Sequence, residues 1–315
     1  MTASGGLAEQ AATVGVCRMW LGKISTRLDL TARQRDDIAM AASQYLLPTS
    51  HAGISVRESD GSGPAVLLLH GNSSCKEVFR NQFEGDLGAR YRLIAIDLPG
   101  HGRSSNAVNP ARTYSMPGYA DMAVEVLGRL GVTRFAVLGW SLGGHNGLEM
   151  FTRHDGMAGL LATGTPPVSS MADSLAAGFL PSEHMRIAGA ADITAAEAEA
   201  YARRTCGDNA PFALFLLDAA RRTDGQARAR MFAAFGGGLG ADQRHLAETI
   251  DRPLAIVSGG DEAFVNNDYL RQVRYRCLWD GQVHVLPGIG HAPFWEAPQT
   301  FDPIFARFLG DVLGP

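Results

Sequence analysis

The sequence predicts an α/β fold: a mostly parallel, twisted sheet covered on both faces by helices. Short apolar runs rich in β-forming residues recur along the chain, and helical stretches lie between most of them. Several of these runs are apolar throughout, which is typical of strands buried on both faces. The clearest helical stretches are residues 117–130 and 141–152. The expected strands are residues 54–58, 65–69, 92–96, 134–138, 159–162, 254–257 and 283–286.

One interval in this alternation is too long for a single crossover helix. It runs from about residue 162 to 254, contains helical stretches at 190–205, 211–222 and 226–235, and then reaches three consecutive glycines. We therefore expect an inserted helical cap. The predicted organisation is an N-terminal extension (1–45), a core in two pieces (46–164 and 242–315) and the cap (165–241).

Little in the N-terminal extension points to chemistry. Residues 26–42 are consistent with a polar helix, and Met40 precedes a stretch that reads as the start of a strand-led domain. One hypothesis is that the functional chain begins near Met40. Loss of folding or activity on deleting residues 1–39 would reject it.

The composition is that of an ordinary globular protein, with 46% hydrophobic and 19% charged residues and a net charge of -4. This balance gives no electrostatic footprint for nucleic acid. No apolar run approaches the roughly 20 residues of a membrane helix, and the apolar stretch before Arg18 lacks the basic start of a signal peptide. The four cysteines are scattered, so free thiols and a cytoplasmic location are expected.

The segment Gly139-Trp140-Ser141-Leu142-Gly143 carries the strongest chemical signal. A G-x-S-x-G sequence between a strand and a helix is the nucleophile elbow, a turn so sharp that its serine adopts strained backbone angles. Small neighbours leave room for that turn, and the following helix N-terminus favours developing negative charge. Ser141 is therefore the predicted nucleophile.

A serine nucleophile needs a base, and the base needs an acid to orient it. His291 lies on a glycine-rich loop after the last predicted strand, which fits the chain order serine, acid, histidine. The acid is expected after the preceding strand, where Asp261 and Glu262 are neighbours. From the residues alone, the choice between these two carboxylates stays open.

An oxyanion hole needs two backbone N–H donors. The residue after the nucleophile, Leu142, supplies one. The loop after an early strand supplies the other, and the N–H of Asn72 in His70-Gly71-Asn72 is the expected donor.

Together these residues resemble the α/β-hydrolase family from about Ser50 to the C-terminus. The sequence DLPGHGRS (97–104) matches a loop that shapes the floor of the site in that family, where His101 would seldom be catalytic. The family commonly places its acid in G-x-x-[D/E]. With Gly259 as that glycine, the resemblance favours Glu262 over Asp261.

A narrower resemblance is to the α/β-hydrolase type of N-acyl-homoserine lactone lactonase, which degrades bacterial quorum-sensing signals with Ser, Glu and His. It implies that Trp140 lines the acyl pocket and that Tyr201 points its hydroxyl at the substrate carbonyl or ring oxygen. The other interpretations are core packing for Trp140 and an ordinary amphipathic cap residue for Tyr201. The motifs that carry this resemblance are HGNSS, DLPGHG, YSMPGYAD, GWSLGGH, TGTPPV, YARRTCG and GGDEAFV.

The implied activity is metal-independent and cofactor-independent opening of a lactone through an acyl-enzyme. Its substrate would be a small amphiphile, with Phe212 and Phe215, beside Phe179 and Leu216, as candidate contacts for the acyl chain. The alternative is a carboxylesterase or a carbon–carbon bond hydrolase of the same fold. The latter usually carries Gly-Pro-Gly after the HG pair, where this chain has Asn72-Ser73-Ser74. A non-catalytic ligand-binding protein is the third possibility.

Overall fold

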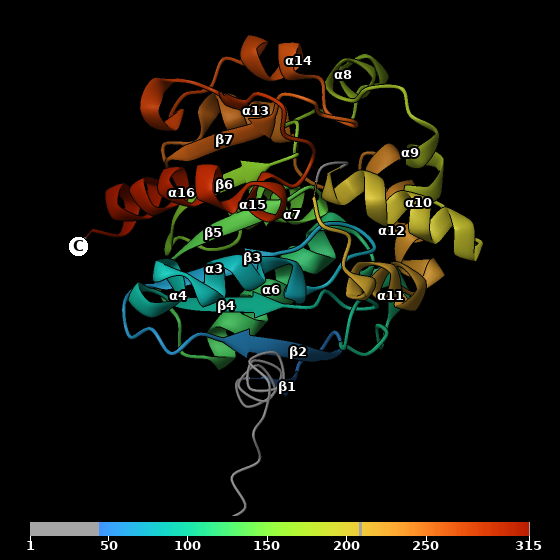
Figure 1. Cartoon of the computed structure of the whole chain (residues 1–315), viewed down its shortest axis with the longest axis horizontal. Helices are drawn as coiled ribbons and strands as arrows, with labels where there is room; N and C mark the ends of the chain where they lie inside the picture. The colour runs from blue at the N-terminus through green and yellow to red at the C-terminus, as the bar shows by residue number, and fades with distance from the viewer. Residues whose placement is uncertain (1–43, 208–209, 315) are drawn as a thin grey trace, which may run out of the picture. The chain divides into compact units, whose positions relative to one another are not determined.

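A computed structural model describes residues 44–207 and 210–314, and an eight-stranded sheet runs through it in the order β1-β2-β4-β3-β5-β6-β7-β8 (Figure 1). Strands β1 and β2 pair antiparallel, as do β2 and β4, and the remaining neighbours are parallel. This architecture confirms the predicted fold class. The strands are β1 (Gln44–Pro48), β2 (Gly53–Glu58), β3 (Ala65–Leu69), β4 (Arg92–Ile96), β5 (Phe135–Trp140), β6 (Met157–Thr163), β7 (Leu254–Gly259) and β8 (His284–Leu286).

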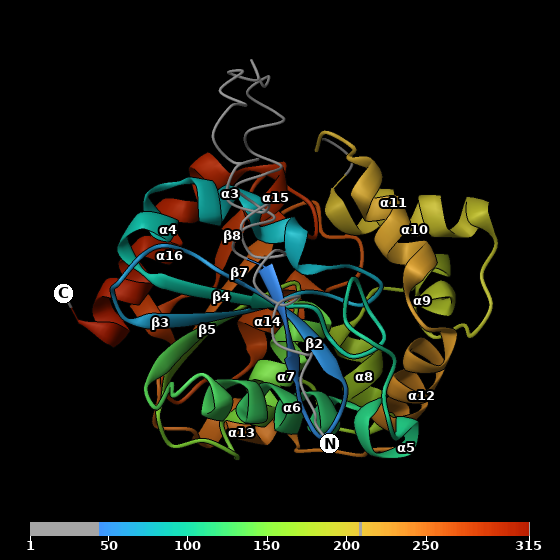
Figure 2. The same cartoon turned by 90° about the horizontal axis from the view of Figure 1, so that it is seen from below.

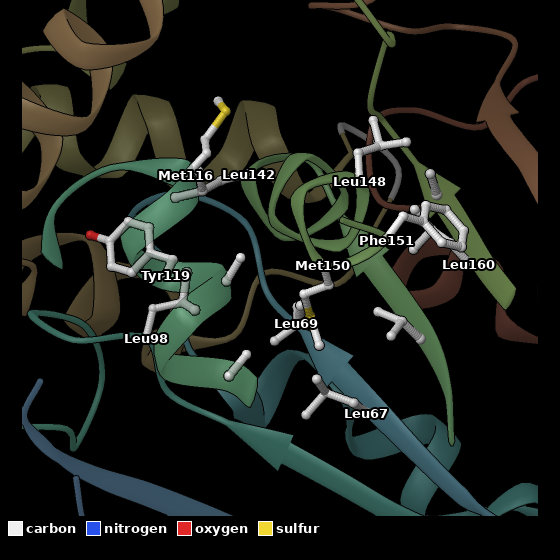
Figure 3. Packing of buried hydrophobic residues seen from close by; sticks show 14 of the residues in the cluster. Leu67, Leu69, Leu98, Met116, Tyr119, Leu142, Leu148, Met150, Phe151 and Leu160 are labelled. Atoms are coloured by element: carbon white, nitrogen blue, oxygen red, sulfur yellow. The ribbon is translucent and has the colours of Figure 1, made fainter. Parts of the chain in front are cut away.

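Strand β3 shows why these runs form a central sheet. Its residues are all buried, and they alternate between the two hydrophobic clusters on opposite faces. Leu67 and Leu69 belong to one cluster, whereas Val66 and Leu68 belong to the other. Figure 3 shows Leu67 and Leu69 packed under Met150 of the neighbouring helix. An apolar residue at every position is therefore required, because a strand alternates its side chains between faces.

Helices cover both faces of the sheet, as Figure 2 shows. Helices α6 (Met116–Arg129), α7 (Leu142–Met150) and α13 (Gln243–Thr249) lie on one face, and α14 (Asn267–Gln272) packs into the same cluster. The opposite face carries η1 (Lys76–Phe79), α3 (Arg80–Glu84), α4 (Asp86–Arg90), α15 (Pro293–Glu296) and α16 (Pro298–Leu313). Two short elements, α5 (Pro110–Thr113) and η2 (Trp279–Gly281), complete the core.

Among the described residues, the interval predicted as a cap (165–241) contains five helices, and α9 to α12 gather beside the carboxyl ends of the parallel strands (Figure 1). Helix α10 begins five residues later than the sequence pattern suggested, because Thr194 and Glu197 form a capping box there. The helices are α8 (Ala172–Gly178), α9 (Glu183–Ala188), α10 (Ala195–Cys206), α11 (Leu214–Arg222) and α12 (Gly225–Gly236).

Strand β1 extends the core to Gln44, two residues before the boundary expected from the sequence. The polar helix suggested for 26–42 and the proposed start near Met40 lie outside the described residues. Within 44–207 and 210–314, no helix combines the length and apolar character needed to cross a bilayer.

Candidate active site

Ser141 lies in the sharp turn between β5 and α7, with φ 53° and ψ -117°. A positive φ is unfavourable for a residue with a side chain, and such positions store about 1–3 kcal/mol of strain. Hydrogen bonds hold the turn: the Ser141 N–H donates to Thr163 O at 2.9 Å, and Thr165 Oγ1 donates to Ser141 O at 3.0 Å. The strained geometry expected of a nucleophile elbow is therefore present at this serine.

The positions around Ser141 must be glycine because a side chain there would clash with neighbouring atoms. A Cβ on Gly139 would lie 2.5 Å from Gly143 O, and one on Gly143 would lie 2.0 Å from Leu69 O. A Cβ on Gly144 would lie 2.1 Å from Thr165 Oγ1. The backbone of α7 can approach β3 and β5 only because these positions lack side chains.

We expect Gly143→Ala to destabilise the fold by about 3 kcal/mol or more, because its methyl group overlaps the backbone of β3. Gly128→Ala is the matched control, since a Cβ at Gly128 in α6 meets nothing within 4 Å. Alanine there should stabilise by up to about 1 kcal/mol. Urea unfolding of both variants measures the difference, and equal stability would contradict the steric argument.

His291 and Glu262 face one another across the carboxyl ends of β8 and β7. Nδ1 of His291 donates a hydrogen bond to Oε1 of Glu262, and both side chains are almost fully buried. The ring of Phe264 lies against His291 at 4.7 Å between centroids, and Trp140 Nε1 donates to His291 O at 2.9 Å. A carboxylate that accepts from Nδ1 leaves Nε2 unprotonated and able to take a proton.

The neighbouring carboxylate, Asp261, is exposed, and its backbone N–H donates to Ile289 O. The structure thus brings Glu262, and not Asp261, to the histidine. This placement agrees with the choice that the family spacing favoured.

Asn72, Leu142 and Ser141 line one cavity between the core and the cap. Leu142 is the first residue of α7, so its N–H has no acceptor within the helix. Asn72 follows β3, and its side-chain Nδ2 donates to Ala188 O of the cap at 2.8 Å. The backbone N–H groups of Asn72 and Leu142 are thus the candidate donors for an oxyanion hole beside Ser141.

Tyr201 of cap helix α10 lies on the same cavity as Asn72, Leu142 and Ser141. Its side chain is buried and lines the cavity together with Asn72. Burial raises the pKa of the Tyr201 hydroxyl, so it remains a hydrogen-bond donor at any working pH.

The cavity that these residues share has a volume of about 270 Å³. Ser141 and His291 stand at a polar end formed with Asn72, Leu142 and Tyr201. The rest of the lining is mostly apolar and comes from both the core and the cap: Met116, Leu175, Phe179, Met185, Met231, Phe232, Phe235 and Phe264. A ligand with a polar head and an oily tail fits this distribution.

The fold and the elbow agree with comparison to known proteins. A family model described as alpha/beta hydrolase fold matches residues 64–298. The chain belongs to the α/β-hydrolase family.

This α/β hydrolase is similar in structure to N-acyl homoserine lactonase AidH in complex with N-butanoyl homoserine, with a TM-score of 0.83 and 47% identity over 85% of this chain and 97% of that one. A Pseudomonas 2-hydroxy-6-oxononadienedioate/2-hydroxy-6-oxononatrienedioate hydrolase is 26% identical, over 82% of this chain and 92% of its own. An esterase from Exiguobacterium antarcticum has a TM-score of 0.70 at 18% identity, covering 85% of this chain and 99% of that one, which shows the fold alone.

Four residues expected to contact substrate, Trp140, Phe212, Phe215 and Leu216, do not line this cavity. Trp140 is 1% exposed and does not line the cavity; it packs edge-on against Phe294, because the last residue of β5 points to the opposite face of the sheet. Phe212 lies under the guanidinium of Arg203, 3.9 Å from the ring centroid. Phe215 and Leu216 also lie outside the cavity, the former packed against Trp295.

His145 is a cavity residue that the sequence analysis missed. It follows Ser141 by one helical turn in α7, and its position in GWSLGGH was the available signal. His101, by contrast, is fully buried with Nδ1 against Pro99 O, which fits the floor position expected for it. Among residues 44–207 and 210–314, no cluster of three or more His, Cys, Asp or Glu side chains is arranged to hold a metal ion.

Proposed function

We propose that this α/β hydrolase opens the lactone ring of N-acyl-homoserine lactones with Ser141 as nucleophile, His291 as base and Glu262 as the orienting acid. The observation that carries the proposal is the 47% identity to a lactonase over 85% of this chain, a span that includes the cap as well as the core. The shared cavity supports it, because a small polar end beside Ser141 leads into an apolar chamber.

In the first half of the reaction, Oγ of Ser141 attacks the lactone carbonyl carbon while Nε2 of His291 takes its proton. The N–H groups of Asn72 and Leu142 donate to the resulting oxyanion; losing one such donor typically lowers the rate by about 100- to 1000-fold. The ring C–O bond then breaks, and the ring oxygen leaves as a hydroxyl with the proton from His291. The product stays attached to Ser141 as an ester.

In the second half, His291 takes a proton from water as the water oxygen attacks the ester carbonyl. Collapse of this intermediate returns the proton to Ser141 Oγ and releases the ring-opened acyl-homoserine acid. Glu262 keeps Nδ1 protonated throughout and stabilises the imidazolium that forms in each half. In this proposal the Tyr201 hydroxyl, which lines the same cavity, donates to the substrate carbonyl or ring oxygen.

The test is proton release in weak buffer, with mass detection of a water-added product, for homoserine lactones of short, medium and long acyl chain. A simple ester is assayed in parallel, because relatives at 26% identity include an esterase from Neisseria meningitidis. Rapid turnover of the lactones supports the proposal. Turnover of the ester alone would reject it and assign a carboxylesterase.

The cavity lining predicts which aromatic residues set chain-length selectivity. Phe235→Ala enlarges the apolar chamber, so the ratio of kcat/KM for long over short acyl chains should rise on the order of tenfold. Phe212→Ala removes the same kind of side chain outside this chamber and should leave the ratio within about twofold. An equal effect of the two changes would show that the acyl chain does not occupy the chamber.

A further inference from the structure

His145 brings one polar ring into the apolar part of the cavity. It is 4% exposed, lines the chamber, and packs against Phe235 and Phe179 at 5.2 and 6.0 Å between ring centroids. The steps of the proposed hydrolysis do not use it. Burying an imidazole among aromatic rings costs free energy unless its ring nitrogens have hydrogen-bond partners.

Gln243 of α13 supplies one partner and fixes the tautomer of the ring. Its amide Nε2 donates to His145 O at 3.3 Å and to Met116 Sδ at 3.7 Å, so the amide oxygen is the atom that faces the ring. Nδ1 of His145 lies 2.6 Å from that oxygen. Because an amide oxygen only accepts, Nδ1 carries the proton and Nε2 carries a lone pair.

The ring stays in this neutral form at ordinary pH. Burial lowers the pKa of His145 to about 4, against a smaller opposing effect of the Gln243 hydrogen bond. No described residue forms a hydrogen bond with Nε2. The chamber therefore holds an acceptor that is not matched by a donor of the protein.

The position of this acceptor along a bound substrate follows from the helix. The His145 N–H bonds to Ser141 O, and residues four apart on a helix have Cβ atoms about 5–6 Å apart. In an acyl-homoserine lactone, the third carbon of the acyl chain is five bonds from the ring carbonyl carbon, about 6 Å when extended. With the ring carbonyl at Ser141 and the acyl chain directed along α7, that third carbon lies at the distance of His145, which lines the same cavity.

We infer that His145 selects acyl-homoserine lactones that carry a hydroxyl group on the third acyl carbon. The hydroxyl donates to Nε2, whereas a ketone at the same carbon presents a second acceptor and leaves both unpaired. This inference rests on the proposed lactonase function and adds its preferred substrate class.

The test compares kcat/KM for 3-hydroxyacyl and 3-oxoacyl homoserine lactones of equal chain length. We expect the wild-type enzyme to favour the hydroxyl form on the order of tenfold. His145→Phe keeps a ring but removes the acceptor and should bring the ratio near one. Gln243→Leu removes the acceptor for Nδ1, so that either ring nitrogen of His145 can carry the proton. Turnover of the 3-oxo form should therefore rise relative to the hydroxyl form.

Each ratio is measured within one preparation, so a partly folded variant still reports it. Phe212→Ala, a change outside the chamber, should leave the ratio as in the wild type. Equal turnover of both substrates by the wild type, or an unchanged ratio in His145→Phe, would overturn the inference and leave the lactonase function intact. Absence of turnover with every lactone, unsubstituted ones included, would instead overturn the proposed function and this substrate preference with it.

Discussion

Replacing Ser141 with alanine is expected to lower kcat on the order of 10⁵-fold. The remaining rate would come from the oxyanion donors and substrate binding, which serine hydrolases retain when the nucleophile is lost. The fold should survive, because alanine removes only the Oγ atom, and the turn is held through the backbone of residue 141, which bonds to Thr163 O and to Thr165 Oγ1. Steady-state hydrolysis, with labelling by a fluorophosphonate probe, measures the loss.

Ser258→Ala is the matched control for this change. Ser258 is fully buried in β7, outside the cavity, and its Oγ has no hydrogen-bond partner among the described residues. The control should keep both activity and probe labelling. Covalent labelling of Ser141→Ala at the wild-type rate would place the nucleophile elsewhere.

The second large effect is expected at the acid. Glu262→Gln should lower kcat by about 10³- to 10⁴-fold, because a neutral amide cannot stabilise the imidazolium and can present an N–H that turns His291 to the wrong tautomer. KM should change little, since Glu262 lies behind the histidine and does not line the cavity. Steady-state kinetics on a single lactone separates the two parameters.

Asp261→Asn provides the comparison, with the same loss of charge one residue away. Asp261 is exposed, and the hydrogen bond to His291 is made by Glu262, so kcat should stay within about threefold of the wild type. A larger loss in Asp261→Asn than in Glu262→Gln would reverse the assignment of the acid.

The sheet was predictable because its strands are buried on both faces and so consist almost entirely of apolar residues. The elbow was predictable because its geometry restricts residue type at several adjacent positions, as the contacts of Gly139, Gly143 and Gly144 show. The choice between Asp261 and Glu262 was not predictable from the residues, because chain position alone does not tell which of two adjacent side chains turns inward. The G-x-x-[D/E] spacing of the family favoured Glu262.

The lining of the cavity by the cap could not be predicted for a related reason. Aromatic residues occur on more than one face of the cap helices, and a helical pattern does not reveal which face meets the core. Phe212 and Phe215 pack on Arg203 and Trp295, whereas Phe232 and Phe235 of α12 reach the chamber. The resemblance implied that Trp140 lines the acyl pocket, but the alternation of side chains along β5 places this ring on the opposite face of the sheet.

The hydrogen bond from Asn72 to Ala188 joins the loop that carries an oxyanion donor to helix α9 of the cap. A displacement of α9 away from the core must break this bond and free the Asn72 side chain. This one bond therefore ties the loop after β3, on the core side of the cavity, to the cap side of the same cavity.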